Sequence, residues 1–271
     1  MNLAFLTSDL KIVGMDYSVV IPSYKRPEGC RDKTLALLHE YRIPKEKIFV
    51  VVADQEQKAE YEKILDPKTY GKILVGVPGL AEVRNWIFEH FPKGTHLVSC
   101  DDDIRGFIEY DASSKRHERK LRSLKDVIKR GFAECKKANS SFWGVYPSAN
   151  GFFMKPTVST DLKFIIGSFW GCINPGKEIH IDRSEKEDYE RTLKFFVRDN
   201  VVVRLNFVSP KTAYYKEPGG MQTRDRTKHQ HAAVKVLLKK YPQFVKSNPT
   251  RKSGFPEIRI ADRRITQKKR D

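Results

Sequence analysis

Three consecutive carboxylates, Asp101, Asp102 and Asp103, follow an apolar run in a chain that is otherwise strongly basic. Neighbouring carboxylates repel each other, so we expect a cation close by. Carboxylate oxygens are hard ligands that suit Mg²⁺ or Mn²⁺, and alternate side chains of an extended segment point to the same side. We therefore predict that Asp101 and Asp103 bind one divalent metal ion while Asp102 faces elsewhere. The alternative is a solvated turn with a helix-capping aspartate.

Polar groups suited to a nucleotide follow two other apolar runs. After the run 17–21, Tyr24 is able to stack on a base, and Lys25 or Arg26 is able to bind phosphate. The same segment is also typical of an ordinary proline-bounded turn. After the run 48–53, the Asp54 carboxylate is placed either to accept a hydrogen bond from a pyrimidine imide or to cap a helix. Both segments are candidates for nucleotide binding.

A helix start supplies a further candidate anion site. Gly79 precedes a helical pattern at 80–91, whose first backbone N–H groups attract anions, and Arg84 lies one turn in. The chain contains neither GxxxxGK[ST] nor GxGxxG, which argues against a P-loop or dinucleotide-binding enzyme. Bound phosphates would instead be held by a metal ion and arginine.

The order of the apolar runs indicates the fold class. Four β-branched runs predict buried strands, and the segments between them are able to form helices. This alternation predicts an α/β fold with a mostly parallel central sheet. The acidic triplet then lies at the carboxyl end of the fourth strand, where open α/β sheets place ligand sites. The predicted strands are 17–21, 48–53, 72–77 and 96–100, and the predicted helices are 34–41, 57–65 and 80–91.

The second half of the chain has mixed patterns. Residues 111–122 are polar and basic and predict an exposed loop, after which Ser123 is predicted to cap an amphipathic helix through a Ser-x-x-Asp pattern. Further elements are predicted at 185–196 (helix), 201–208 (strand) and 234–241 (helix). The tail after residue 242 is basic and shows no periodic core.

Several aromatic side chains of this half have two interpretations. Each is able to stack on an everted base, but a core position is favoured for each taken singly. They are Phe152, Phe153, Phe169 and Trp170.

The composition indicates a globular protein with an anionic partner. The 271 residues include 51 Lys and Arg against 34 Asp and Glu, a net charge of +17. Such a charge attracts nucleic acid or an anionic membrane surface, although a merely soluble basic surface is the alternative. The four cysteines form no CxxC pair, so neither a zinc site nor a disulfide framework is indicated. No segment reaches the roughly 18 apolar residues of a membrane span, so we expect a cytoplasmic location.

Four segments, in the order found here, resemble the nucleotide-sugar-binding half of GT-A glycosyltransferases: VVIPSYKRP, VVADQ, VPGLAEVRN and LVSCDDD. The resemblance covers residues 17–103, and in that family an Asp-x-Asp motif holds a metal ion against the sugar diphosphate. The segments GSFWGC, KEDYERTLKFF and GGMQ are similar to those of glycosyltransferases that modify hydroxymethylated pyrimidines in phage DNA, which are related to enzymes that accompany base-oxidising dioxygenases.

The resemblance implies one GT-A domain over 1–271, with a nucleotide-sugar-binding half at 17–110, an acceptor-binding half at 111–242 and a basic tail at 243–271. For the nucleotide sugar it implies Pro22, Tyr24, Arg26, Asp54, Gly79, Arg84, Asp101 and Asp102. For Mn²⁺ or Mg²⁺ it implies Asp101, Asp103 and a late histidine, His229. The candidate DNA contacts are Lys115, Arg116, Arg119, Lys120, Arg122 and Trp170, joined by the tail cations Arg251, Lys252, Arg259, Arg263 and Arg264.

A Glu-Asp pair at the start of the helix at 185–196 supplies the candidate base. Ser184 and Glu187 match a capping box, so Glu187 is expected to cap the helix. Because many GT-A enzymes carry their base at such a pair, the resemblance implies Asp188 as the base that takes the acceptor proton, with Glu187 as second choice. For His229 and the neighbouring His231, a surface position is the alternative to metal binding.

We therefore expect a metal-dependent glycosyltransferase that moves glucose or arabinose from a UDP-sugar to the hydroxymethyl group of 5-hydroxymethylcytosine in DNA. The metal ion and Arg84 would stabilise the departing diphosphate. We expect double-stranded DNA as the partner, and we expect no contact with a membrane. The alternatives are a GT-A enzyme with a polysaccharide or lipid-linked acceptor, a non-catalytic nucleic-acid-binding protein, and a nucleotidyltransferase.

Overall fold

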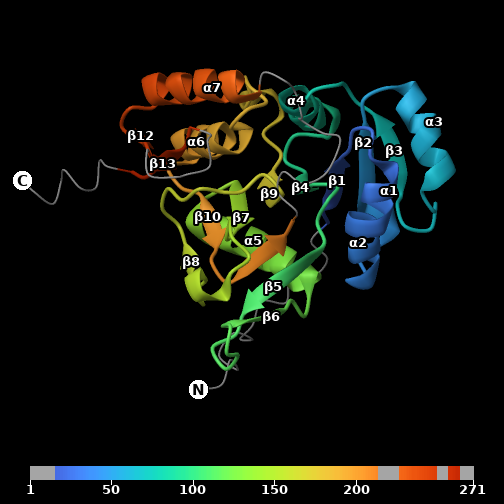
Figure 1. Cartoon of the computed structure of the whole chain (residues 1–271), viewed down its shortest axis with the longest axis horizontal. Coiled ribbons are helices and arrows are strands. Elements are labelled where there is room, and N and C mark those ends of the chain that lie inside the picture. The colour runs from blue at the N-terminus through green and yellow to red at the C-terminus, as the bar shows by residue number, and fades with distance from the viewer. Residues whose placement is uncertain (1–15, 213–225, 249–255, 263–271) are drawn as a thin grey trace, which may run out of the picture.

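The computed structural model describes residues 16–212, 226–248 and 256–262. An eight-stranded sheet crosses the centre of the molecule (Figure 1). Its strands are β1 (Ser18–Pro22), β2 (Ile48–Val52), β3 (Lys72–Val75), β4 (His96–Cys100), β7 (Phe142–Val145), β8 (Val158–Ser159), β9 (Phe169–Ile173) and β10 (Val203–Leu205). They lie in the order β3-β2-β1-β4-β9-β7-β10-β8.

The first four strands confirm the sequence prediction to within one or two residues, and they pair in parallel. Strand β9 runs antiparallel to both of its neighbours, whereas β10 is parallel to β7. The architecture is thus α/β with a large, mostly parallel sheet. The strand order reverses at β1, because β2 and β3 extend the sheet on one side of it and β4 on the other.

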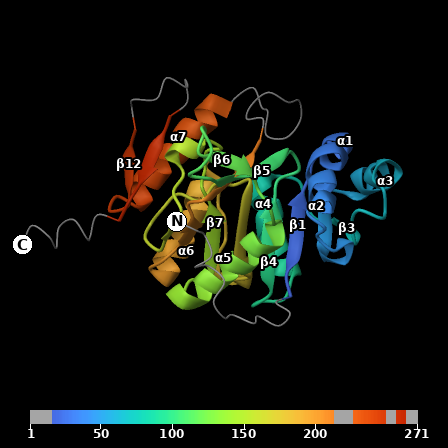
Figure 2. The same cartoon turned by 90° about the horizontal axis from the view of Figure 1, so that it is seen from below.

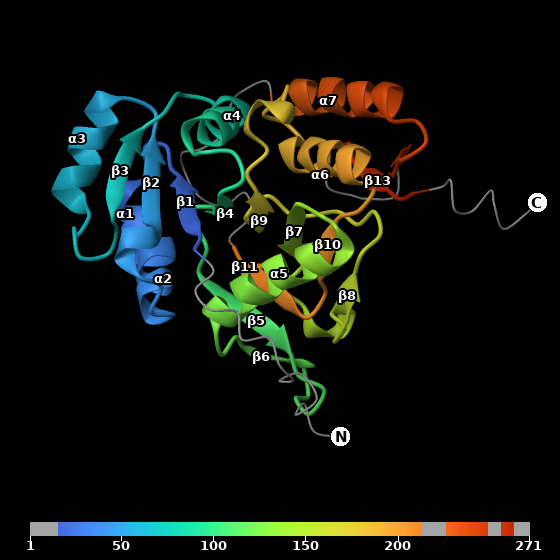
Figure 3. The ribbon, with the colours of Figure 1, turned by 180° about the vertical axis from the view of Figure 1, so that it is seen from behind.

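Helices cover both faces of the sheet (Figure 3). One face packs against α2 (Ala36–Glu40) and α5 (Leu124–Ala138), and the other against α4 (Leu80–His90), α6 (Glu187–Asp199) and α7 (Arg226–Lys240). The remaining helical segments of the first half are α1 (Pro27–Gly29), the π-helical turn η2 (Cys30–Leu35), the 3-10 turn η3 (Lys45–Lys47) and α3 (Gln55–Ile64).

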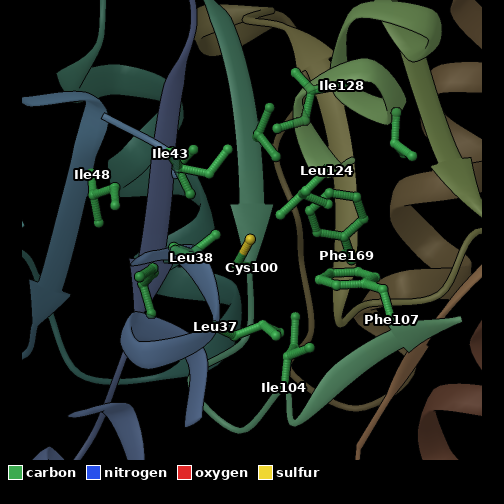
Figure 4. Packing of buried hydrophobic residues seen from close by; sticks show 14 of the residues in the cluster. Leu37, Leu38, Ile43, Ile48, Cys100, Ile104, Phe107, Leu124, Ile128 and Phe169 are labelled. Atoms are coloured by element: carbon green, nitrogen blue, oxygen red, sulfur yellow. The ribbon is translucent and has the colours of Figure 1, made fainter. Parts of the chain in front are cut away.

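Alternate side chains of the central strands enter two separate hydrophobic cores. In β1, Val19 belongs to the core under α2 and α5, whereas Val20 belongs to the core under α4 and α6. Figure 4 shows part of the first core, in which Leu38, Leu124 and Phe169 gather around Cys100. Cys100 ends β4 directly before the acidic triplet, so this packing fixes the place where the triplet begins.

A smaller three-stranded sheet projects from the main body (Figure 1), and Figure 2 looks onto it from below. Its order is β11 (Val208–Lys211), β5 (Gly106–Tyr110) and β6 (Glu118–Lys120). The predicted loop at 111–122 therefore contains a strand. The predicted strand at 201–208 is divided between β10 and β11, because a turn at residues 206–207 interrupts it.

The helix starts and the tail give mixed outcomes. The Ser123 cap is confirmed, since its hydroxyl accepts a hydrogen bond from the Asp126 backbone N–H at 3.2 Å. The tail was predicted to lack a core, but β12 (Val245–Ser247) and β13 (Ile258–Ile260) pair within it, with Val245 and Ile258 buried. Among the described helices, none has the length and apolar character that crossing a bilayer requires.

Candidate functional site

A cavity of about 410 Å³ opens at the carboxyl ends of β1, β2 and β4, beside the point where the strand order reverses. Open α/β sheets bind their ligands at such switch points. From the end of β1 the cavity wall contains the predicted residues Pro22, Tyr24 and Arg26, and from the loop before α4 it contains Gly79. The complete acidic triplet also lines it. The structure thus brings together most residues predicted for the nucleotide sugar.

Asp102 is the buried anchor of the triplet. Its side chain accepts hydrogen bonds from the Ser23 hydroxyl at 2.6 Å and from the Arg26 guanidinium, and the residue is 2% exposed. Burial raises the Asp102 pKa to about 6, against the opposing effect of Arg26. The prediction that Asp102 faces elsewhere is not confirmed, because Asp102 lines the same cavity as Asp101 and Asp103 and shares Arg26 with Asp103. Both of its oxygens accept bonds within the protein, and its predicted contact to the nucleotide stays a prediction.

Arg26 was predicted to bind phosphate, but its guanidinium binds an aspartate of the triplet. The guanidinium binds the Asp102 carboxylate and lies 4.0 Å from Asp103. Lys25 before it has a positive φ of 54°, which is uncommon for a residue with a side chain, and this turn is held because Gln57 accepts a hydrogen bond from the Lys25 N–H at 3.0 Å. Arg26 is therefore the cation that the sequence required beside the triplet, and it lines the cavity as well.

Asp101 faces the cavity but is tied to the protein on two sides. Its backbone N–H donates to the Ser168 carbonyl at 2.9 Å, and its carboxylate accepts a hydrogen bond from Arg84 at 2.9 Å. The side chain keeps 36% of its surface exposed, yet the surrounding protein raises its pKa to about 7, with Arg84 opposing this shift. Bringing a cation to this carboxylate would stabilise its charged form.

The predicted role of Arg84 as a phosphate ligand is wrong for this structure. Arg84 is 2% exposed, and it donates to the Ser99 hydroxyl as well as to Asp101. Arg84 therefore orients Asp101 and does not line the cavity.

The triplet fits a metal ion that shares its ligands with a substrate. Asp101 and Asp103 both line the cavity, and Mg²⁺ is commonly held by one or two carboxylates together with substrate phosphates. Within the described ranges, no group of three or more His, Cys, Asp or Glu side chains is arranged to hold a metal ion. His229 is therefore not assembled with the two aspartates. Its Nδ1 instead lies 3.7 Å from the Glu185 carboxylate.

The start of α6 differs from the predicted capping box. Helix α6 begins at Glu187, and Lys186 before it has a positive φ of 59° and gives no side-chain cap. Ser184 instead accepts a hydrogen bond from the Ala81 N–H at 3.1 Å, which joins this segment to the start of α4. Glu187 is buried and forms an ion pair with Arg191 one turn later. Glu187 is thus committed to the protein interior, which leaves Asp188 as the candidate base.

Asp188 lies against the same turn as Asp101. A Cβ atom placed on Gly167 would come within 3.0 Å of a Glu187 oxygen and 3.6 Å of the Asp188 Cβ. The next residue, Ser168, is the one that accepts the Asp101 N–H. Burial, with a smaller contribution from the neighbouring Glu187, raises the Asp188 pKa to about 6. The acidic pair and the triplet therefore meet at the turn before β9, while Ser184 and Glu185 supply the cavity wall.

Trp170 is a core residue, and its predicted contact to DNA is wrong. The indole is 2% exposed and belongs to the core under α4 and α6. The Arg191 guanidinium lies 4.2 Å from the centre of its ring and the Arg84 guanidinium 5.5 Å. Trp170 therefore contacts both arginines that hold the acids of the site.

Asp54 caps a helix, which was the alternative to its predicted contact with a pyrimidine. Its carboxylate accepts hydrogen bonds from the backbone N–H of Gln57 at 2.8 Å and from the Gln57 side chain at 3.1 Å, so it caps α3. These bonds lower its pKa. The neighbouring Ala53, not Asp54, lines the cavity.

The predicted basic loop is part of the β5–β6 hairpin. Lys115 and Arg116 are exposed at its tip, whereas Arg119 pairs with Glu109 at 2.7 Å. Lys120 pairs with Glu40, and Arg122 lies 3.8 Å from Glu109. Three of the five cations predicted to contact DNA from this loop therefore already lie against acidic side chains. The GGMQ loop and the tail cations Arg251, Lys252, Arg263 and Arg264 lie outside the described residues.

Several residues of the site were not anticipated from the sequence. Ser23, Ser184 and Glu185 line the cavity, and Gly167 and Arg191 position the acidic pair. Ser23 stood beside the predicted Tyr24, and Arg191 stood one helical turn after Glu187, a spacing that favours an ion pair. Gly167 begins the GSFWGC segment, but no role was predicted for it, because its close approach to α6 is a tertiary contact.

Comparisons with known proteins do not identify a family. No protein-family profile and no curated protein matches the chain. A solved crystal structure, described only as that of a mycobacterial protein, is similar at 9% identity and a TM-score of 0.46, covering 93% of this chain and 88% of its own. This similarity is too distant to assign an activity.

Proposed function

We propose that this chain is a metal-dependent GT-A glycosyltransferase that moves a sugar from a UDP-sugar to the hydroxymethyl group of 5-hydroxymethylcytosine in DNA. The observation that carries the proposal is the place of Asp101 and Asp103, which line a cavity at the switch point of an α/β sheet. An anionic diphosphate would be repelled by these carboxylates. A divalent cation held by Asp101 and Asp103 would remove that repulsion, and this is the part that an Asp-x-Asp motif plays.

The cavity suits a nucleotide in size and in chemistry. About 410 Å³ lies within the usual range of small-molecule sites. Its apolar wall includes Val52, Leu80 and Val83, and Tyr24 is 39% exposed at its edge, where a base can stack. The wall also contains the charged side chains of the triplet and Arg26. Apolar and charged groups together suit a ligand that combines a flat base with phosphates.

The proposed reaction is a group transfer with one proton to remove. The hydroxymethyl oxygen of the acceptor forms a bond to the anomeric carbon, while the bond from that carbon to the β-phosphate oxygen breaks and UDP leaves. The proton of the attacking hydroxyl passes to the Asp188 carboxylate. Bound Mn²⁺ or Mg²⁺ supplies positive charge next to the diphosphate as it departs. Within the protein, Arg84 orients Asp101 and Arg191 orients Glu187.

The test is a transfer assay on defined DNA. The full chain is incubated with Mn²⁺, single UDP-sugars, and oligonucleotides that contain cytosine or 5-hydroxymethylcytosine, and the digested nucleosides are weighed. We expect a pentose or hexose increment on the hydroxymethylated base alone, and none with Asp103→Ala. The absence of an increment with every donor, or full turnover by Asp103→Ala, would refute the proposal.

A further inference from the structure

A second cavity, of about 400 Å³, lies beside the β5–β6 hairpin and is separate from the site described above. Its wall is strongly cationic, because it combines residues of the hairpin with residues of β11 and of the segment that follows the acidic triplet. The cations are Arg105, Arg116, Arg119, Lys120 and Lys211, against the two acids Glu40 and Glu118. We call this cavity the hairpin groove.

The two acids of the groove neutralise only part of the positive charge of its wall. Lys120 pairs with Glu40, and Lys211 lies 4.0 Å from Glu118. Arg119 pairs with Glu109, which is not part of the groove wall. Arg116 is exposed at the hairpin tip, and, in all, five cations face two acids on this concave surface. A row of phosphates is the ligand chemistry that compensates such an excess.

An exposed aromatic pair stands beside the hairpin. Phe152 and Phe153 are 63% and 62% exposed, and both belong to the 3-10 turn η4 (Gly151–Phe153). The Phe152 ring packs edge-on against His117, with ring centres 5.2 Å apart. Large apolar side chains exposed side by side are unusual in a monomer and mark surfaces that meet a partner.

The turn that carries the pair is fixed to the hairpin. Glu118 of the groove accepts a hydrogen bond from the Gly151 N–H at 3.0 Å, and Asn150 accepts one from the Phe152 N–H at 3.1 Å. A Cβ atom on Gly151 would lie 2.4 Å from the Arg116 carbonyl oxygen, so the turn lies directly against the hairpin. The aromatic pair and the cations therefore form one preorganised surface rather than two unrelated ones.

The surface also continues from the candidate active site. Arg105 of the groove lies two residues after Asp103, which lines the first cavity. The β5–β6 hairpin itself projects away from the main sheet, as Figure 3 shows. A polymer bound in the groove would pass close to the acidic triplet.

We infer that the hairpin groove and the Phe152–Phe153 pair bind a nucleic-acid strand with unpaired bases, whose phosphates meet the groove cations and whose bases stack on the phenyl rings. Stacking on aromatic side chains together with a cationic track is the general way in which unpaired strands are held. A flat anionic bilayer would meet exposed cations equally well but has no need of a groove. The inference rests on the proposed function in taking DNA as the acceptor, and it adds that the DNA is locally unpaired.

The experiment measures anisotropy of a labelled single-stranded oligonucleotide, of the matching duplex, and of the duplex with one unpaired base, using the full chain. Phe152→Ala with Phe153→Ala is expected to lower affinity for the single strand and the unpaired site by about 10- to 100-fold, with little change in salt dependence. Arg116→Ala with Lys211→Ala is expected to reduce the slope of log affinity against log salt by about 1.4. The matched control, Lys129→Ala with Lys136→Ala on the exposed side of α5, should leave both quantities unchanged.

The outcomes separate this inference from the proposed function. The replaced phenyl rings are exposed, so we expect an unchanged melting temperature, and unchanged Mn²⁺-dependent hydrolysis of UDP-sugar in the absence of DNA would show an intact donor site. If the wild-type chain uses no UDP-sugar but shows the expected binding pattern, the proposed function fails and the groove remains a nucleic-acid site. The inference would be overturned by an equal loss of affinity in the α5 control or by unchanged affinity in the phenylalanine variant. It would also be overturned if the variants lost binding to vesicles with 30% anionic lipid but kept their binding to the oligonucleotides.

Discussion

The Arg191 guanidinium lies 4.2 Å from the centre of the Trp170 indole, and the Arg84 guanidinium lies 5.5 Å from the same ring. Each arginine holds one acid of the candidate site, Arg84 through Asp101 and Arg191 through Glu187. Cations are attracted to the face of an aromatic ring, most strongly in a desolvated setting. Trp170 thus contacts the arginine of each ion pair, one arginine from α4 and one from α6.

Replacing Arg191 by Met should destabilise the protein strongly. The Glu187 carboxylate would be left buried without its cation, and breaking a buried pair in this way costs about 3–5 kcal/mol. The double variant Glu187→Leu with Arg191→Met should recover most of the loss, because it removes both charges. Urea unfolding measures the free energies. Equal losses in the single and double variants would show that the ion pair is not the cause.

Activity should rise with pH as Asp188 loses its proton. Burial raises the Asp188 pKa to about 6, so the fraction of the carboxylate able to accept a proton grows between about pH 5 and 7 and is constant above. We expect kcat/KM, measured at saturating Mn²⁺, to follow this curve, and Asp188→Asn to lose activity at every pH. A profile that is flat from pH 5 to 8 would contradict the assignment.

Deprotonation of Asp188 should lower the free energy of unfolding, although it raises activity. A carboxyl group whose folded pKa is raised is better tolerated in its protonated form, so its effect on stability is most favourable below the unfolded pKa near 4 and declines as pH rises through about 6. Relative to wild type, Asp188→Asn should therefore gain free energy of unfolding as pH increases from 4 to 7. Urea titrations at fixed pH values test this. A difference that stays constant across this range would show that Asp188 titrates normally.

The local elements could be predicted from the sequence, but the long-range partners could not. The β-branched runs and the Ser123 cap are decided within a few residues, and each was found where the pattern placed it. Aromatic residues carry no such local signal. Trp170 was assigned to DNA and is enclosed, whereas Phe152 was expected in the core and is 63% exposed. Their positions depend on contacts with residues far away in the chain.

The triplet shows the same limit at the scale of single contacts. Its place after β4 followed from the apolar run, and the need for a nearby cation followed from charge repulsion. Which cation pairs with which carboxylate depends on the three-dimensional fold, since Arg26 lies in the turn after β1 and Arg84 in α4. The sequence therefore predicted the site, but it assigned to phosphate two arginines that bind aspartates of the triplet.

Asp103→Ala should weaken binding of Mn²⁺ in the presence of UDP by at least about 10-fold, since the ion loses a carboxylate ligand and keeps Asp101. The exposed Asp32, which pairs with its neighbour Arg31, offers a matched control in Asp32→Asn. Titration calorimetry with Mn²⁺ and UDP together measures both variants. If Asp103→Ala binds Mn²⁺ as the control does, the ion is held elsewhere.

Gly131→Ala should destabilise the core, because Gly131 of α5 faces the Trp143 ring. An added Cβ atom would lie 2.3 Å from the indole. A Cβ atom on Gly171 of β9 would likewise lie 2.4 Å from this ring, so backbone encloses the indole closely from a second element and leaves it little room to move away. Overpacking of this kind costs about 1–3 kcal/mol. Gly106→Ala is the matched control, since an added Cβ atom there would meet nothing within 4 Å. Alanine is otherwise favoured over glycine by about 1 kcal/mol inside a helix such as α5, so a lower stability of Gly131→Ala than of Gly106→Ala in urea unfolding would report the clash. Equal stability would show that α5 shifts to accommodate the methyl group.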